Sequence, residues 1–261
     1  MRLHHELAGS GPRVLFFNGS GATLEGSAPI INGLREFATV LAHDQRGLGK
    51  TGIIDGPFTM AQYARDAADL LDHVGWSTCI VVGISFGGMV AQEFAVTYPE
   101  RVKKLVLLCT GAGGEAGSSY PLHDDVGLEP GVRAMKQRTL FDTRFTDEYL
   151  ANDNFAAAMA KMLHDREFVP KSDEVRRGEV MQLEARRHHD VADRLHRVTC
   201  PTLVMAGRYD GIAPVANSEA IATRIPNAEL RVYEGGHLFI AQDPAAIADI
   251  RNVVVTGRGM A

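Results

Sequence analysis

The chain has 261 residues, 45% of them hydrophobic, and a formal net charge of −5. A chain of this length and apolar content can bury a substantial core, as one large domain or as a domain with an insertion. The acidic balance supplies no positive field for phosphate groups, which disfavours nucleic acid and anionic membrane surfaces as partners. No segment approaches the roughly 18 apolar residues of a membrane span and no signal-peptide run begins the chain, so a cytoplasmic protein is predicted.

Short apolar runs alternate with amphipathic segments of helical length, which is typical of a mostly parallel sheet covered by helices on both faces. The predicted strands are residues 14–18, 39–44, 79–83, 102–109, 202–207 and 230–235. Helices are predicted at 60–74, from just after Ser85 to Pro99, and in the C-terminal segment "DPAAIADIRNVVV". The cysteines, Cys79, Cys109 and Cys200, lie in or beside apolar runs, which favours buried reduced thiols over disulfides.

The alternation breaks between residues 111 and 197. A Gly- and Ser-rich stretch, "TGAGGEAGSSYPLHDD", is followed by segments of helical pattern that contain no strand candidate. We therefore predict an α/β, doubly wound and mostly parallel sheet built from residues 1–110 and 198–261. A helical cap is predicted at residues 111–197, inserted between two strands of that sheet.

Three glycines surround Ser85 in the stretch "CIVVGISFGG", at Gly83, Gly87 and Gly88. A serine at a sharp strand-to-helix turn has a strained backbone, and side chains two residues before and after it would collide with neighbouring backbone. Glycine at positions 83 and 87 removes those collisions, and Gly88 lets the helix begin close to the sheet. The helix N-terminus then directs free N–H groups toward the serine. The pattern favours an exposed nucleophile over an ordinary loop serine.

A serine nucleophile needs a base that takes its proton and an acid that orients the base. Asp210 follows the predicted strand 202–207, and His237 follows the last predicted strand. Both positions are at the carboxyl ends of strands, where an open parallel sheet collects functional groups. The order Ser85, Asp210, His237 is the order expected for a hydrolase of this architecture, so these residues are the predicted catalytic triad.

Four motifs, spread from Val14 to Pro244, resemble those of the α/β-hydrolase superfamily. They are the nucleophile elbow "GISFGG", the acid turn "AGRYDGIAP", the histidine loop "EGGHLFIAQDP" and the structural turn "HDQRGLGKT". Within the superfamily the chain resembles the cofactor-free branch of 3-oxoadipate enol-lactonases, haloperoxidase-like proteins and esterases. The resemblance implies the α/β-hydrolase fold and a reaction that uses no metal, nucleotide or flavin.

The superfamily's oxyanion hole consists of two backbone N–H groups. One belongs to Phe86, which follows the nucleophile. The other comes from the loop "FFNGSGAT", in which Ser20 is the matching position and Gly19 the neighbouring alternative. Asn18 stands where relatives often carry histidine, which puts the hydrogen bonds that support this loop in doubt.

Three further patterns are interpreted as structural. Asp44 begins a turn and resembles the family's structural aspartate rather than the triad acid. The string "GLGKT" lacks the first glycine of a phosphate-binding loop, because the residues before Gly47 do not fit that motif. Glu184 and His188 share a helical face, but with no third ligand evident a solvated surface is expected there instead of a metal site.

These observations predict a serine hydrolase that cleaves a small-molecule carboxylic ester or lactone through an acyl-enzyme. One alternative keeps the triad for carbon–carbon bond hydrolysis or perhydrolysis, although Leu238 stands where carbon–carbon hydrolases typically have tryptophan. Another is a slow-turnover ligand receptor on the same fold. Met159 and Met162, which share a predicted helical face with Phe155, form the candidate pocket wall, with packing inside the cap as the alternative. The substrate and the oligomeric state are left open.

Overall fold

A computed structural model describes residues 3–53 and 58–256. In these residues seven strands form one sheet in the order β1-β3-β2-β4-β5-β6-β7. They are β1 (His5–Gly9), β2 (Arg13–Phe17), β3 (Thr39–His43), β4 (Cys79–Ile84), β5 (Val102–Leu108), β6 (Thr202–Gly207) and β7 (Ala228–Tyr233). β1 pairs antiparallel with β3, and all other neighbours pair in parallel. The predicted mostly parallel sheet is confirmed.

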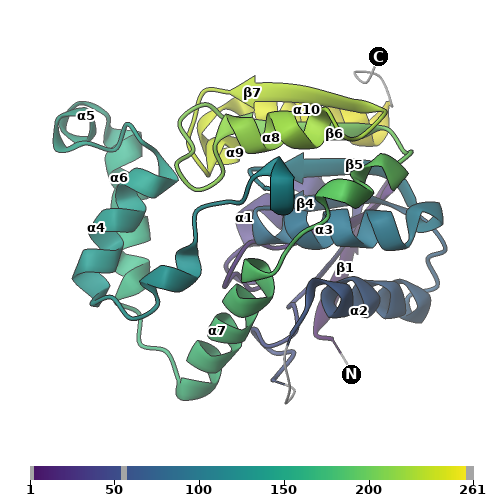
Figure 1. Ribbon diagram of the computed structural model, residues 1–261, viewed down its shortest axis with the longest axis horizontal. Coiled ribbons are helices and arrows are strands. Elements are labelled where there is room, and N and C mark those ends of the chain that lie inside the picture. Colours follow the sequence, from purple (N-terminus) through teal and green to yellow (C-terminus); the bar gives the residue numbers. More distant parts are fainter. Residues whose placement is uncertain (1–2, 54–57, 257–261) are drawn as a thin grey trace.

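Helices cover both faces of the sheet, as Figure 1 shows. One face carries α2 (Met60–His73), α3 (Phe86–Thr97) and α8 (Val215–Ala222), and the other carries α1 (Ala28–Arg35), α9 (Phe239–Gln242) and α10 (Pro244–Val255). Successive strand residues point to opposite faces, so Leu15 and Phe17 belong to one hydrophobic cluster while Val14 and Phe16 belong to the other. Burial on both sides explains the uninterrupted apolar runs of the central strands.

β1 was absent from the predicted strands. Its sequence, HELAG, is short and mostly solvent-exposed, and the strand lies at the edge of the sheet. An edge strand that contacts water on most sides does not need the apolar run that marks the buried strands. Its pairing with β3 is therefore set by the tertiary structure.

Residues between β5 and β6 are helical and contain no strand. They form α4 (Pro130–Phe141), α5 (Asp147–Asn152), α6 (Asn154–Glu167) and α7 (Asp173–Arg187), with short 3₁₀ turns before and after them. In Figure 1, α4, α5 and α6 lie together to one side of the sheet, and α7 leads back toward it. A separate hydrophobic cluster around Phe145 and Leu163 holds α4, α5 and α6 together. In the part of the chain that the structure describes, no helix combines the length and apolar character needed to cross a membrane.

Candidate active site

Ser85 lies in the turn between β4 and α3, with a backbone φ of 55° and ψ of −117°. A positive φ is unfavourable for a residue with a side chain, so neighbouring structure must hold this conformation in place. The Ser85 N–H donates to the carbonyl of Leu108 at 2.8 Å, and its own carbonyl accepts from the Thr110 hydroxyl at 2.8 Å. Both partners lie at the end of β5, so the turn is fixed by the adjacent strand as well as by α3.

Close backbone approaches explain the three glycines around Ser85. A Cβ on Gly83 would lie 2.4 Å from the carbonyl oxygen of Gly87, and a Cβ on Gly87 would lie 2.2 Å from that of Phe17. A Cβ on Gly88 would lie 2.7 Å from the Cβ of Thr110. None of these distances can accommodate a carbon atom without moving the backbone or the buried threonine, which confirms the steric reason predicted for the glycines.

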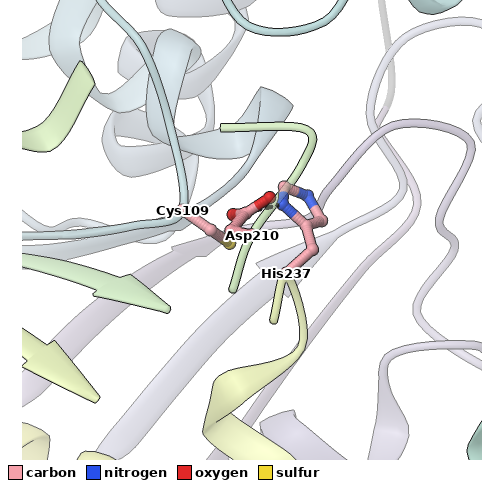
Figure 2. A group of neighbouring side chains, drawn as sticks. All are labelled: Cys109, Asp210 and His237. Carbon is pink, nitrogen blue, oxygen red and sulfur yellow. Dashed lines mark hydrogen bonds and ion pairs between the residues drawn. The ribbon is translucent and has the colours of Figure 1, made fainter. Parts of the chain in front are cut away.

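Asp210 and His237 come from the loops after β6 and β7, and their side chains meet beside Cys109 (Figure 2). His237 Nδ1 lies 2.8 Å from Asp210 Oδ2, and His237 Nε2 lies 2.9 Å from Ser85 Oγ. A carboxylate only accepts hydrogen bonds, so Nδ1 carries the ring proton and Nε2 is left to accept from the serine hydroxyl. The structure therefore brings the three predicted residues into one hydrogen-bonded chain.

The residues around the Ser85–His237–Asp210 hydrogen bonds shield the His–Asp pair from water. Asp210 is 5% exposed and His237 is 6% exposed, whereas Ser85 is only partly buried. The remaining carboxylate oxygen of Asp210 accepts the N–H groups of Ile212 and Ala213, each at 2.8 Å. These bonds hold the carboxylate in the plane in which it meets the imidazole, so orientation does not depend on solvent.

The end of α4 is hydrogen-bonded to both loops that carry the pair. The Gly211 N–H donates to the carbonyl of Leu140 at 2.9 Å, and the His237 N–H donates to the carbonyl of Phe141. The Phe141 ring packs edge-to-face against the His237 imidazole, with ring centroids 5.6 Å apart. The helical insertion thus contributes directly to the position of His237, a contribution that sequence reasoning missed.

A partly buried polar network extends this connection. Gln242 accepts from the Gly236 N–H at 2.8 Å through Oε1 and donates to Asp142 Oδ2 at 2.8 Å through Nε2. Asp142 is 1% exposed and forms a two-point ion pair with Arg144, whose guanidinium lies 4.0 Å from the centroid of the Tyr209 ring. In the sequence, Asp142 and Arg144 carry no motif that distinguishes them from surface charges. We refer to Asp142, Arg144 and Gln242 as the loop-bracing network.

Free N–H groups are available for an oxyanion beside Ser85. Phe86 is the first residue of α3, so its N–H has no acceptor inside the helix. Within the described ranges, the N–H groups of Phe86, Gly19 and Ser20 make no hydrogen bond. Gly19 lies against the nucleophile, since a Cβ on it would be 3.6 Å from that of Ser85. Both loop positions named from the sequence therefore remain candidates for the second donor.

The loop that carries these donors has its own hydrogen-bond support. The Asn18 side chain donates to the carbonyl of His43 at 3.2 Å, and the Asn18 carbonyl accepts from the Gln45 side chain at 2.8 Å. The Gly21 N–H donates to Gln182 of α7 at 2.7 Å. Asparagine at position 18 thus anchors the loop where the sequence had left its support in doubt.

One group of side chains in the described chain has the composition of a metal site. The potential ligand atoms of Cys109, Asp210 and His237 lie within 4.8 Å of one another (Figure 2). Burial, and then the charge of Asp210, raise the pKa of the Cys109 thiol well above its ordinary value, which keeps the thiol protonated. Both imidazole nitrogens of His237 are already hydrogen-bonded. This chemistry fits a hydrogen-bonded catalytic pair better than a metal site.

Three side chains that resembled functional groups are engaged elsewhere. Asp44 is 2% exposed and accepts the N–H groups of Leu24 at 2.8 Å and Lys50 at 2.9 Å, which supports the predicted structural role. Glu184 and His188 form a 2.9 Å pair on α7, with side chains 55% and 72% exposed. The latter pair is an ordinary solvated contact between residues one helical turn apart.

Met159 and Met162, the candidate pocket wall with packing inside the cap as the alternative, lie in different surroundings on α6, and Phe155 is exposed like Met162. Phe155 is 54% exposed and Met162 is 55% exposed, whereas Met159 is 8% exposed and packs in the cluster that includes Leu163. Helical periodicity groups residues on one side but does not say how deeply each is covered by neighbouring helices. Leu238 packs against the same cluster, so Met159 belongs to the apolar packing behind the histidine loop.

The model of the alpha/beta hydrolase fold family matches residues 12–244. The chain belongs to this family. The match covers the elbow, the acid turn and the histidine loop together, so it confirms the predicted superfamily and fold class.

Curated relatives of the chain carry several activities in their names. A poly(3-hydroxyalkanoate) depolymerase from Ectopseudomonas oleovorans is 33% identical over 248 residues, which cover 91% of this chain and 82% of that protein. The 3-oxoadipate enol-lactonase 2 of Acinetobacter baylyi is 27% identical over 235 residues, covering 90% and 85%. A 2-hydroxymuconate semialdehyde hydrolase from Pseudomonas putida is 32% identical over 244 residues, covering 88% and 82%. The resemblance to the enol-lactonase branch is thereby confirmed.

Proposed function

We propose that the protein is a serine hydrolase that cleaves a carboxylic ester or lactone of a small molecule. The observation that carries this proposal is the continuous hydrogen-bonded chain from Ser85 Oγ through His237 to Asp210. It lies at the carboxyl ends of β4, β6 and β7, on a strained turn that leaves only Ser85 partly exposed. This arrangement suits an acyl-transfer reaction and has no evident structural purpose.

The proposed reaction proceeds in two halves. Ser85 Oγ attacks the carbonyl carbon while His237 Nε2 takes the hydroxyl proton, and the carbonyl oxygen becomes an oxyanion. His237 then gives that proton to the alcohol oxygen as the carbon–oxygen bond breaks, which leaves an acyl-enzyme. In the second half, His237 takes a proton from water, the resulting hydroxide attacks the acyl carbon, and the proton returns to Ser85 Oγ as the acid leaves.

Backbone donors stabilise the oxyanion in this proposal. The donors are the Phe86 N–H and the Ser20 N–H, with Gly19 as the alternative, and they belong to two segments of the chain that meet beside Ser85. Removal of one such donor typically lowers the rate by about 10²–10³-fold, so the loop at residues 18–21 matters as much as the triad. The hydrogen bonds of Asn18 and Gly21 hold this loop at the site.

We further propose that residues 111–197 act as the cap that shapes the substrate pocket. The bonds from Leu140 and Phe141 to the loops of Asp210 and His237 place the end of α4 at the site. Ester and lactone substrates are supported by the relatives named depolymerase and enol-lactonase. The relative named 2-hydroxymuconate semialdehyde hydrolase favours carbon–carbon bond hydrolysis as the second candidate, although Leu238 departs from the tryptophan typical of such enzymes.

Hydrolysis of a chromogenic short-chain ester tests the proposal. We expect a burst of alcohol product followed by steady turnover, and labelling of Ser85 by an organophosphate at one mole per mole of protein. A panel of short acyl, long acyl and lactone substrates, with a ring-fission product included, then ranks the two candidates. A single very slow turnover with a stable conformational change would instead indicate a ligand receptor, and unlabelled Ser85 would contradict the proposed nucleophile.

A further inference from the structure

A cavity of about 410 Å³ lies between the first turn of α3, the segment after β5 and the end of α7. The polar side chains that line it include Ser119, His123, Arg186, Arg187 and His189, and no carboxylate from the described chain is among its lining residues. Met89 forms its wall on α3, one helical turn after Ser85. Ser85 and His237 are not among its lining residues, and Met89 places the cavity close to the start of α3, next to the proposed active site.

Arg186 is a buried cation with no counterion among the residues that the structure describes. It is 6% exposed, and its Nε and Nη2 atoms are buried with no hydrogen-bond partner in the described chain. Burial lowers its pKa to about 10, which still leaves the guanidinium protonated at neutral pH. A buried charge is strongly unfavourable unless it is paired, so binding of an anion would stabilise this side chain.

Other arginines of the chain show what this edge of a guanidinium normally binds. Arg46 uses Nε and Nη2 to hold both oxygens of Asp66 at 2.8 Å. Arg144 uses the same two atoms on Asp142 at 2.9 and 2.7 Å. This planar fork matches the spacing of two carboxylate oxygens. In Arg186 the same two atoms have no partner among the described residues, and Arg186 itself lines a cavity whose described lining contains no carboxylate.

Further unpaired polar groups surround the same cavity. Among the described residues the Ser119 hydroxyl is buried without a partner. The ring nitrogens of His189 meet no acceptor at full hydrogen-bond geometry, and the Gly111 backbone is a polar group that acts on this ring. Ser119 is 8% exposed and His189 is 6% exposed. Buried polar groups in native proteins are nearly always paired, so several unpaired ones around one cavity indicate a shared ligand.

We propose that this cavity binds a small carboxylate, with Arg186 as the charged anchor and Ser119 and His189 as hydrogen-bond partners. The carboxylate comes either from the acid end of a molecule that Ser85 acts on or from a separate small anion. Gln182 lies one turn before Arg186 on α7 and holds the Gly21 N–H of the oxyanion loop at 2.7 Å. Occupancy of the cavity therefore acts on the same helix that supports the oxyanion loop.

Titration with butyrate and with its neutral amide, butyramide, tests the binding site at constant ionic strength. We expect the protein to bind butyrate at least tenfold more tightly than butyramide, because only the carboxylate pairs with the guanidinium. Arg186→Met should weaken butyrate binding at least tenfold. Arg176→Met, which removes the same charge from an exposed position of α7, should leave it unchanged. Equal binding of butyrate and butyramide, or equal binding by the Arg186 and Arg176 variants, would overturn the proposal.

A second variant tests the binding site even if Arg186→Met fails to fold. Ser119→Ala removes one hydroxyl from the cavity wall and is expected to weaken butyrate binding several-fold while the melting temperature stays within a few degrees. Unchanged butyrate affinity in a folded Ser119→Ala protein would contradict the proposed hydrogen bond between the Ser119 hydroxyl and the carboxylate. If Arg186→Met folds, its melting temperature without butyrate should equal or exceed that of the wild type, because an unpaired buried charge has been removed.

The source of the carboxylate is distinguished by kinetics, and this arm rests on the proposed ester hydrolysis. For methyl hydrogen succinate, which carries a free carboxylate, Arg186→Met should lower kcat/KM at least tenfold if the acid end of the substrate binds Arg186. Dimethyl succinate should then be affected less than twofold, and butyrate should inhibit competitively. Equal effects on both esters with non-competitive butyrate indicate a separate anion. If the protein hydrolyses neither ester, the proposed function is contradicted. The butyrate titration still shows whether the cavity binds a carboxylate.

Discussion

Ser85 has a strained backbone, and its hydroxyl is hydrogen-bonded to the proton acceptor His237 Nε2. Because Ser85 and His237 act as one unit, each single substitution to alanine should lower kcat by at least about 10³-fold, and the double variant should be little worse than either. Substrate binding should change little. Steady-state kinetics on the chromogenic ester measure this, with Met162→Ala as the exposed control. Additive losses in the double variant would mean that the two residues do not share one step.

Two aspartates near the ends of strands have opposite roles. Asp210 contacts His237, whereas Asp44 accepts the backbone N–H groups of Leu24 and Lys50. Asp210→Asn should lose several orders of magnitude in kcat with little change in melting temperature, because it disturbs the imidazole tautomer. Asp44→Asn should instead lower the free energy of unfolding by about 1–3 kcal/mol, because it weakens bonds to a buried carboxylate. The reverse ranking at matched folding would contradict the assignment of the acid.

At the level of elements, α4 is part of the site even though it belongs to the insertion. Gln242→Met removes the link between Gly236 and Asp142 while it keeps the side-chain length. We expect kcat to fall about tenfold with KM nearly unchanged, because a small misplacement of His237 affects the reacting atoms more than substrate binding. Kinetics at a temperature well below the melting transition measure this effect. An unchanged kcat would show that the loop-bracing network serves stability alone.

The two methionines of α6 differ in burial, because Met159 is packed in a hydrophobic cluster and Met162 is exposed to solvent. Met159→Ala opens space in the cluster around Leu163 and should lower the free energy of unfolding by about 2–5 kcal/mol. Met162→Ala lies on an exposed surface and should stay within about 0.5 kcal/mol of the wild type. Denaturant titration compares them directly. Equal losses would mean that the exposed face of α6 is covered in solution.

At the scale of the whole molecule, buried histidines make stability depend on pH. Burial lowers the pKa of both His43 and His189 from 6.5 to about 4. Between these values the unfolded chain binds more protons than the folded one, so the free energy of unfolding falls as pH falls from 6.5 toward 4. Above pH 6.5 neither histidine contributes to the slope, because both states are then neutral. Each histidine contributes up to about 3 kcal/mol of this loss.

His43→Gln isolates this effect, because glutamine does not titrate. We expect the difference in unfolding free energy between wild type and variant to shrink steadily as pH is lowered from 6.5 to 4.5. Denaturant titrations at several pH values measure it, and the carboxylates common to both proteins cancel in the difference. Parallel curves for the two proteins would show that the pKa of His43 is the same in the folded and unfolded states.

The sequence by itself determined the parts of this protein that depend on short-range physics. Buried strands must be apolar, glycines must stand where backbones come within contact distance, and parallel strands collect the groups that follow them at one edge. These constraints were sufficient to predict the sheet, the elbow around Ser85 and the order of Asp210 and His237. They did not reveal β1, whose edge position requires no apolar run.

Only the tertiary structure decided which side chains find a hydrogen-bond or ion-pair partner far away in the sequence and which do not. Asp142 and Gln242 are hydrogen-bonded across one hundred residues of sequence, and Gly21 reaches Gln182 across 161. Arg186 stands out only because no carboxylate of the described chain lies within reach of its buried guanidinium. Periodicity grouped Met159 with Met162 but could not say which would be covered. Burial and pairing arise from contacts between segments far apart in the chain, and a local pattern does not contain them.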